Sequence, residues 1–199
     1  MSFSDGEPSR LLSPLMGKTT TFIMEGRQEN LGFARTAMHA LATASLSCVI
    51  FDLDAFYSSN AEVIFAELPG DTSSFIVNVP APGSDIESEF SALFGTEQKV
   101  VVIDSLNSLY HLISAGDVSS RGRKLMFALA CLSQFARSNG VTVILCMYRR
   151  EGFARSGKGR SISTLSDIAA SVGIRGPYLE IRTERGPAWP GGAYSSRVP

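Results

Sequence analysis

An acidic residue that directly follows an apolar run is the side chain of this sequence best placed for chemistry. The run Val100–Ile103 holds four branched apolar residues and leads into Asp104 and the hydroxyl of Ser105. Because a short continuous apolar run is typical of a strand buried on both faces, we expect Asp104 at the carboxyl end of that strand. In nucleotide-binding α/β proteins this position holds the aspartate on the Mg²⁺ side of the phosphates. Another interpretation is that Asp104 only caps the helix that follows.

A phosphate-binding loop would belong between the first strand and the first helix, where backbone N–H groups and the helix dipole favour an anion. The usual pattern, G-x-x-x-x-G-K-[ST], adds a lysine for the phosphates and a hydroxyl for Mg²⁺. The corresponding segment here is Gly26, Arg27, Gln28, Glu29, Asn30, Leu31, Gly32 and Phe33. Leu31 replaces the second glycine, Gly32 the lysine and Phe33 the hydroxyl. Glu29 adds a negative charge where a triphosphate would lie, so high-affinity MgATP binding in the usual mode is not expected.

A second segment, Gly17–Thr20, has the letters Gly-Lys-Thr-Thr of a phosphate loop. No strand is predicted before it, and the residues after it are typical of a strand rather than of a helix. We interpret it as the turn that leads into the first strand.

The spacing of apolar residues predicts the strands and helices that must position these side chains. Strands are expected at Thr19–Met24, Ser47–Leu53, Ser74–Val79, Val100–Ile103, Val141–Met147 and Tyr178–Arg182. Helices are expected at Leu31–Ser45, Asn60–Glu67, Ser84–Phe94, Leu106–Ser114, Leu125–Ser138 and Ser163–Ser171. Polar loops are expected at Glu25–Asn30, Ser119–Lys124 and Tyr148–Arg160. Since strands alternate with helices, the fold class is α/β, a three-layer α/β/α sandwich around a mainly parallel central sheet.

Composition sets the size and the surroundings of this fold. Of the 199 residues, 44% are hydrophobic and 19% are charged, which suits one core domain at 16–194, with a flexible lead-in at 1–15 and a tail at 195–199. The net charge of −1 argues against general attraction to nucleic acid or membranes. The three cysteines lie far apart in apolar runs, which predicts reduced thiols and a cytoplasmic protein. No apolar run approaches ~20 residues, so no membrane span is expected.

Taken in order, these segments resemble the RecA-fold core of the RadA/RadB/KaiC group. The segment VVVIDSLNSLYHLI, Val100–Ile113, is similar to that group's Walker B strand and the residues after it. Val49–Tyr57 is similar to the strand that ends in a catalytic glutamate, and Asp54 falls at that position. Arg123–Leu145 resembles the helix and strand before the second DNA loop. The resemblance covers most of residues 16–194, as in short RadB-type or accessory paralogues without an N-terminal DNA-binding domain.

The resemblance implies a set of nucleotide-site residues. Asp54 would position the attacking water, and Asp104, followed by Ser105, would hold Mg²⁺ if a nucleotide binds. Family members carry an amide that senses the γ-phosphate after the strand matching Val141–Met147, whereas this chain has Tyr148 and Arg149 there. With a degenerate phosphate loop and no sensing amide, the expectation is that no cofactor is bound, or MgATP if the site is functional.

The resemblance also implies two loops that face a channel holding single-stranded DNA. Their counterparts here carry the basic and aromatic residues Arg121, Arg123, Lys124, Arg149, Arg150, Phe153, Arg155, Lys158 and Arg160. Arginine and lysine beside an aromatic ring suit phosphate contacts and base stacking, on DNA or on RNA. The alternative is that both loops are solvated and basic only for solubility.

Three hypotheses for function follow from the sequence. The first is a RecA/RadA-like paralogue that has lost ATP hydrolysis and acts as an accessory or interaction subunit in DNA recombination or repair, binding single-stranded nucleic acid through its basic loops. The second is an active ATPase with a non-standard phosphate loop. The third is a purely structural subunit of a heteromeric RecA-like ring, like the Elongator accessory subunits. The expected partners are a RecA-like paralogue or a second copy of the chain, and no membrane.

Overall fold

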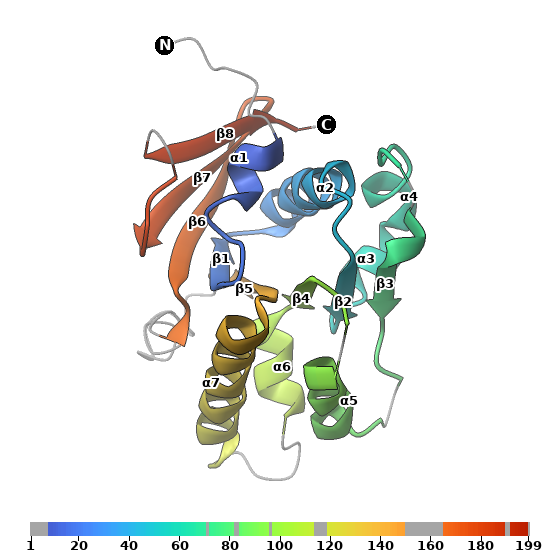
Figure 1. The fold of residues 1–199 in the computed structure, drawn as a ribbon, viewed down its shortest axis with the longest axis vertical. Helices are drawn as coiled ribbons and strands as arrows, with labels where there is room; N and C mark the ends of the chain where they lie inside the picture. The colour runs from blue at the N-terminus through green and yellow to red at the C-terminus, as the bar shows by residue number, and fades with distance from the viewer. Residues whose placement is uncertain are drawn as a thin grey trace.

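The computed structural model describes residues 8–70, 72–81, 84–95, 97–113, 119–149, 165–189 and 192–198. In this part of the chain a single sheet crosses the molecule in the strand order β3-β2-β4-β5-β1-β6-β7-β8 (Figure 1). The strands are β1 (Thr19–Met24), β2 (Cys48–Asp52), β3 (Phe75–Asn78), β4 (Val100–Asp104), β5 (Thr142–Tyr148), β6 (Ile168–Arg175), β7 (Tyr178–Arg185) and β8 (Ala193–Arg197). The first six pair in parallel, and β7 and β8 continue the sheet antiparallel.

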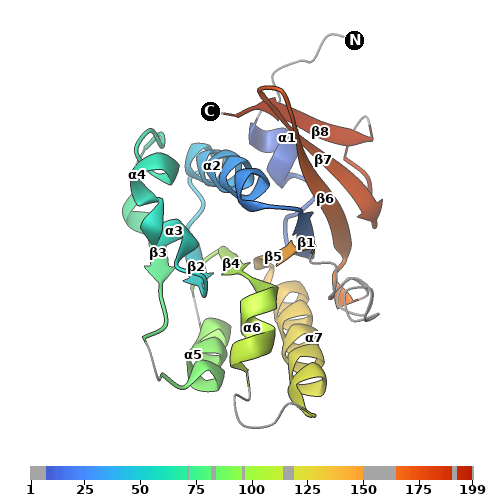
Figure 2. The ribbon, with the colours of Figure 1, turned by 180° about the vertical axis from the view of Figure 1, so that it is seen from behind.

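Helices cover the two faces of this sheet, which confirms the α/β/α sandwich (Figure 2). The helical segments are α1 (Pro8–Leu12), α2 (Arg27–Thr43), α3 (Phe56–Ser59), α4 (Ala61–Ile64), α5 (Ile86–Ala92), α6 (Leu106–Leu112) and α7 (Arg121–Asn139), with single 3₁₀ turns η1 (Thr72–Ser74) and η2 (Leu93–Gly95). The helix α2 lies with α1, α3 and α4 on one face, and α5, α6 and α7 lie on the other. No helix among the described residues is long and apolar enough to cross a membrane.

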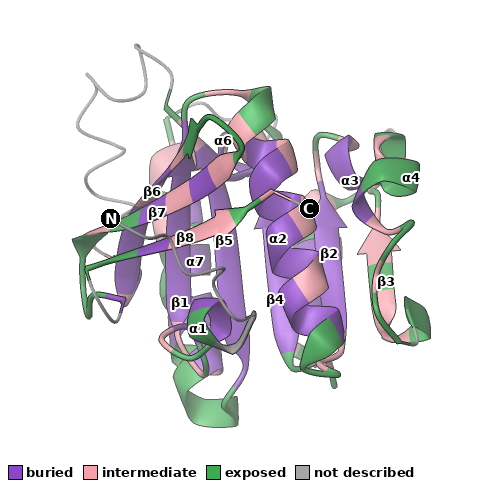
Figure 3. Ribbon diagram, turned by 90° about the horizontal axis from the view of Figure 1, so that it is seen from above, coloured by how far each residue is buried: buried purple, intermediate pink, exposed green. Residues whose placement is uncertain are grey.

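The central strands are apolar along their whole length because both of their faces are covered (Figure 3). In β4, Val100 and Val102 pack into the core under α2, while Val101 and Ile103 pack into the core under α5, α6 and α7. All four side chains are fully buried. The continuous apolar run therefore follows directly from the three-layer arrangement.

The antiparallel strands at the carboxyl end of the chain correct one prediction. A helix was expected at Ser163–Ser171, but Ile168–Ser171 form the start of β6, and residues 163 and 164 lie outside the described part. This stretch pairs in parallel with β1, where Ile168 and Ala170 are fully buried. Pairing with a central strand overrides the helical preference of its alanines.

The residues ahead of β1 pack more tightly than the sequence suggested. A flexible lead-in was expected at 1–15, and residues 1–7 lie outside the described part. In residues 8–15, α1 lies against α2, and Leu11 and Leu15 are fully buried. The indole Nε1 of Trp189 donates a hydrogen bond to the carbonyl oxygen of Leu11, at 3.3 Å. Burial of these large apolar side chains holds both ends of the domain to α2.

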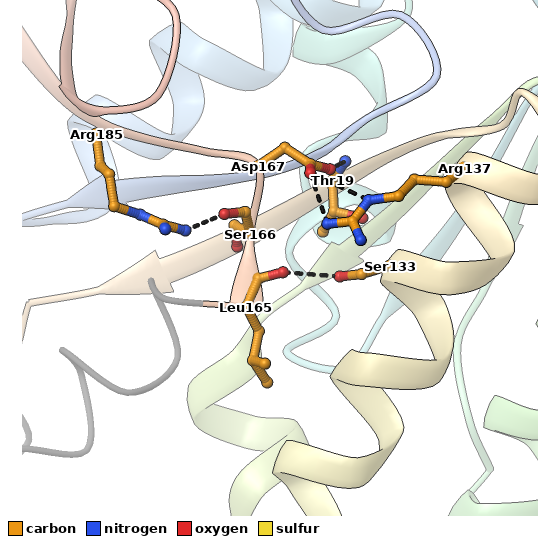
Figure 4. A network of polar contacts seen from close by, with 7 residues as sticks. All are labelled: Thr19, Ser133, Arg137, Leu165, Ser166, Asp167 and Arg185. Carbon is orange, nitrogen blue, oxygen red and sulfur yellow. Dashed lines mark hydrogen bonds and ion pairs between the residues drawn. The ribbon is translucent and has the colours of Figure 1, made fainter.

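A polar network holds the chain where it enters β6 (Figure 4). The Asp167 carboxylate accepts a hydrogen bond from the backbone N–H of Thr19 at 2.9 Å and pairs with the Arg137 guanidinium at 2.7 Å. Next to it, the Ser133 hydroxyl donates to the Leu165 carbonyl at 2.9 Å. These contacts tie β6 to β1 and to α7 at the amino-terminal edge of the parallel strands.

Candidate functional site

Asp104 lies at the carboxyl edge of the sheet, the edge at which α/β proteins bind ligands. Its neighbours in register are Asp52 on β2 and Cys146 on β5. The side chain is fully buried. The Asp104–Ser105 peptide bond is cis, and Ser105 forms the N-cap of α6. The predicted position of Asp104 at the end of a doubly buried strand is confirmed.

The Asp104 carboxylate is held by side chains of the protein itself. Asn30 Nδ2 donates a hydrogen bond to Asp104 Oδ2 at 2.9 Å and also bonds the Tyr148 hydroxyl. Asp104 Oδ1, Asn30 Oδ1 and the Tyr57 hydroxyl have no hydrogen-bond partner among the described residues. Burial raises the pKa of Asp104 to about 7, against the opposing effect of the Asn30 hydrogen bond and with smaller contributions from Asp54 and Asp52.

The segment predicted as a degenerate phosphate loop is not a loop. Only Glu25 and Gly26 separate β1 from α2, and the helix begins at Arg27 rather than at Leu31 as expected. Seven of the eight predicted loop residues, 27–33, therefore belong to the helix. Gly26 has an extended backbone, with φ of −159°. No stretch of free N–H groups remains between strand and helix that could wrap a triphosphate.

Individual residues of this segment have structural roles in α2. A Cβ built on Gly26 would come within 3.2 Å of Glu29 Oε2, so this carboxylate lies over the start of the helix. A helix N-terminus favours a negative charge, so Glu29 stands where an anion would otherwise be favoured. Gly32 packs closely against Leu179 and Ile174, and Phe33 is buried in the core. Arg27 points the other way, with its guanidinium over the Phe56 ring.

The two acidic residues at the end of β2 are engaged with neighbouring backbone and hydroxyl groups. Asp54 accepts hydrogen bonds from the Ser105 hydroxyl at 2.6 Å and from the Ser108 hydroxyl. Asp52 accepts from the backbone N–H groups of Phe56 at 2.7 Å and Ser58 at 2.9 Å. Asp54 thus fixes the start of α6, and Asp52 fixes α3. Both oxygens of each carboxylate are occupied by donors of the protein itself.

A groove of about 390 Å³ opens beside the start of α2. Its charged lining consists of four carboxylates and three guanidinium groups: Glu25, Glu29, Glu180, Glu184, Arg149, Arg175 and Arg182. Arg149 pairs with Glu25 at 3.4 Å and with Glu184 at 3.0 Å. Arg175 and Arg182 both pair with Glu180, at 3.6 and 2.8 Å. The cations are already neutralised, so the groove does not offer the positive field that a triphosphate needs.

These residues do not fit MgATP. Mg²⁺ bound with nucleotide needs one or two carboxylates together with the phosphates, and the phosphates need lysine and backbone N–H donors. Asp104 is present, but Asn30 and Tyr148 cover it and no lysine follows β1. Among the described residues, no group of three or more histidine, cysteine or acidic side chains could hold a metal ion.

The predicted nucleic-acid residues are only partly placed. Arg121, Arg123 and Lys124 were expected in a loop but form the first turn of α7, where Lys124 pairs with Glu87 at 2.9 Å. Arg149 belongs to the ion pairs of the groove. The remaining predicted contacts, Arg150, Phe153, Arg155, Lys158 and Arg160, lie outside the described residues. Two residues that the sequence did not assign to the nucleotide site, Tyr148 and Tyr57, lie close to Asp104 instead.

With this geometry in hand, comparison with known proteins decides the fold. No family model matches the chain, and no curated protein sequence matches it. Among solved structures, the chain is similar to the ATPase domain of a DnaB-like helicase, with a TM-score of 0.61 and 10% sequence identity. The similarity covers 89% of this chain and 80% of that one. The chain has the RecA-like P-loop NTPase fold. At this identity the likeness shows the fold alone, and the degenerate phosphate loop is a feature of this chain's own residues.

Proposed function

We propose that this RecA-fold chain functions without ATP hydrolysis, as an accessory or interaction subunit of a larger assembly. The observation that carries the proposal is the covered carboxylate at the end of β4. Asn30 and Tyr148 occupy the position next to Asp104 that Mg²⁺ and phosphates need, and α2 begins two residues after β1. A RecA-like fold whose nucleotide position is filled by its own side chains is free to serve as a binding scaffold.

Thermal unfolding with millimolar MgATP tests this proposal against the active-ATPase alternative. A ligand that binds only the native state raises stability by ~2.7 kcal/mol at one hundred times its Kd. We expect no shift of Tm beyond that caused by Mg²⁺ alone, and no ATP turnover above that of Asp104→Ala. A nucleotide-dependent shift or a turnover that Asp104→Ala abolishes would establish the ATPase instead.

A role in DNA recombination or repair through single-stranded nucleic acid is the narrower form of the proposal. Its support is the basic composition of the 150–160 region in the sequence. The described cations contribute less, because Lys124 and Arg149 are engaged in ion pairs. Fluorescence anisotropy with labelled single strands at low salt is the test: salt-sensitive binding supports this role, and its absence leaves the purely structural subunit.

A further inference from the structure

The most exposed large apolar side chain of the described residues stands beside an apolar groove. Phe127 on α7 is 73% exposed. Beside it, α5, the residue after α6 and α7 enclose a groove of about 320 Å³. The apolar side chains in its lining are Phe90, Phe94, Ile113, Phe127, Ala128 and Cys131. We name this surface the α5–α7 groove.

The floor of the α5–α7 groove is rigid and belongs to the core. Phe90 and Phe94 are in edge contact, with ring centroids 5.9 Å apart, and Phe94 makes a further edge contact with Phe135 at 5.5 Å. Ile113 and Phe90 are each only 4% exposed. A ring that enters the groove would therefore meet a preformed aromatic wall, which favours an aromatic ligand over a flexible aliphatic one.

The rim of the groove carries one charge of each sign. Lys124 Nζ lies 2.9 Å from Glu87 Oε1, and both side chains are about half exposed, at 45% and 49%. A projecting ring, an aromatic-lined groove, a cation and an anion on one patch make that patch complementary to itself. Self-complementarity of this kind is the requirement of a two-fold, isologous contact.

We propose that the α5–α7 groove is a self-association surface, at which Phe127 of each copy enters the groove of the other. Across the two-fold axis, Lys124 of one copy exchanges its partner for Glu87 of the other, so no charge is left unpaired. The contact lies on the α5, α6 and α7 face of the sheet and does not involve Asp104 or the groove beside α2. It goes beyond the proposed function and holds whether or not nucleotide binds.

Sedimentation velocity over a range of concentrations tests the proposal on the full chain. We expect the wild type to be in reversible monomer–dimer equilibrium and Phe127→Asp to weaken the dimer more than ~10-fold, as for a central aromatic residue of an interface. The matched control is Val63→Asp on α4, which changes another exposed apolar residue, 47% exposed, on the other face of the sheet and should leave the dimer unchanged.

A charge exchange keeps the test decisive if Phe127→Asp unfolds the protein. Lys124→Glu should weaken the dimer by placing like charges across the axis, and Lys124→Glu combined with Glu87→Lys should restore it. A wild type that stays monomeric at every concentration overturns the proposal. So does a dimer that Phe127→Asp and Lys124→Glu leave intact, or an open-ended assembly in place of a dimer.

Discussion

Two aspartates at opposite edges of the sheet are treated very differently by the fold. Asp167, next to the amino ends of β1 and β6, receives a backbone N–H and a guanidinium, and its side chain is 21% exposed. Asp104, at the carboxyl end of β4, is fully buried, and one amide is its only hydrogen-bond donor among the described side chains. Asp167 therefore stabilises the folded chain, whereas the charged form of Asp104 works against it. The difference marks the carboxyl edge as the place where the sequence is not optimised for stability.

The largest expected effect concerns the titration of Asp104. Its folded pKa of about 7 lies above the ordinary 3.8, so the folded state binds a proton more tightly than the unfolded state between these values. The contribution of Asp104 to stability is therefore highest below pH ~4, falls as the pH rises to about 7, and is constant above. Asp104→Asn should remove this loss and raise the free energy of unfolding at pH 8 by up to ~4 kcal/mol.

Urea unfolding of both proteins at a series of pH values measures this effect. Glu62→Gln on α4 is the control, because Glu62 is exposed and its substitution should leave the pH profile of the wild type unchanged. Identical profiles for the wild type and Asp104→Asn would show that Asp104 does not titrate in this window.

The second effect breaks the comparison from the other side. Asp167→Ala leaves the N–H of Thr19 without its acceptor and removes the Arg137 ion pair, and should lower the free energy of unfolding by ~1–3 kcal/mol. Asp167→Asn retains an acceptor oxygen for Thr19 and loses only the half-exposed ion pair, for which ~1 kcal/mol or less is expected. Equal losses for the two variants would assign the whole effect to the ion pair.

Asn30 sharpens the comparison at Asp104. Removing its amide in Asn30→Ala takes away the hydrogen bond that opposes the burial effect, so the pKa of Asp104 should rise above about 7. The pH-dependent loss of stability should then extend to higher pH than in the wild type. Gln28→Ala, at an exposed position in the same first turn of α2, is the control and should keep the wild-type midpoint.

The smallest expected effect lies at Asp54. Ser108→Ala removes one of its two hydroxyl donors at an exposed position and should cost ~1 kcal/mol or less of unfolding free energy. A much larger loss would mean that the Asp54 contacts hold more of the carboxyl edge in place than α6 alone.

The sequence predicted the central sheet well and the candidate site poorly. Apolar runs such as Val100–Ile103 are decided by burial on two faces, a property that residue types reveal directly. The start of α2 was missed because Arg27–Asn30 is polar and follows a glycine, although the helix needs only one buried face. The placement of Asn30 against Asp104 could not be predicted, since it joins residues 74 positions apart through the packing of α2 on the sheet.

Titration calorimetry of MgATP into the wild type and Asp104→Ala tests the central claim most directly. If Asn30 and Tyr148 cover Asp104 and Glu29 lies over the start of α2, no binding heat should be detected at millimolar nucleotide with either protein. Micromolar binding that Asp104→Ala weakens would contradict this account and show that the site opens to hold Mg²⁺ and phosphate.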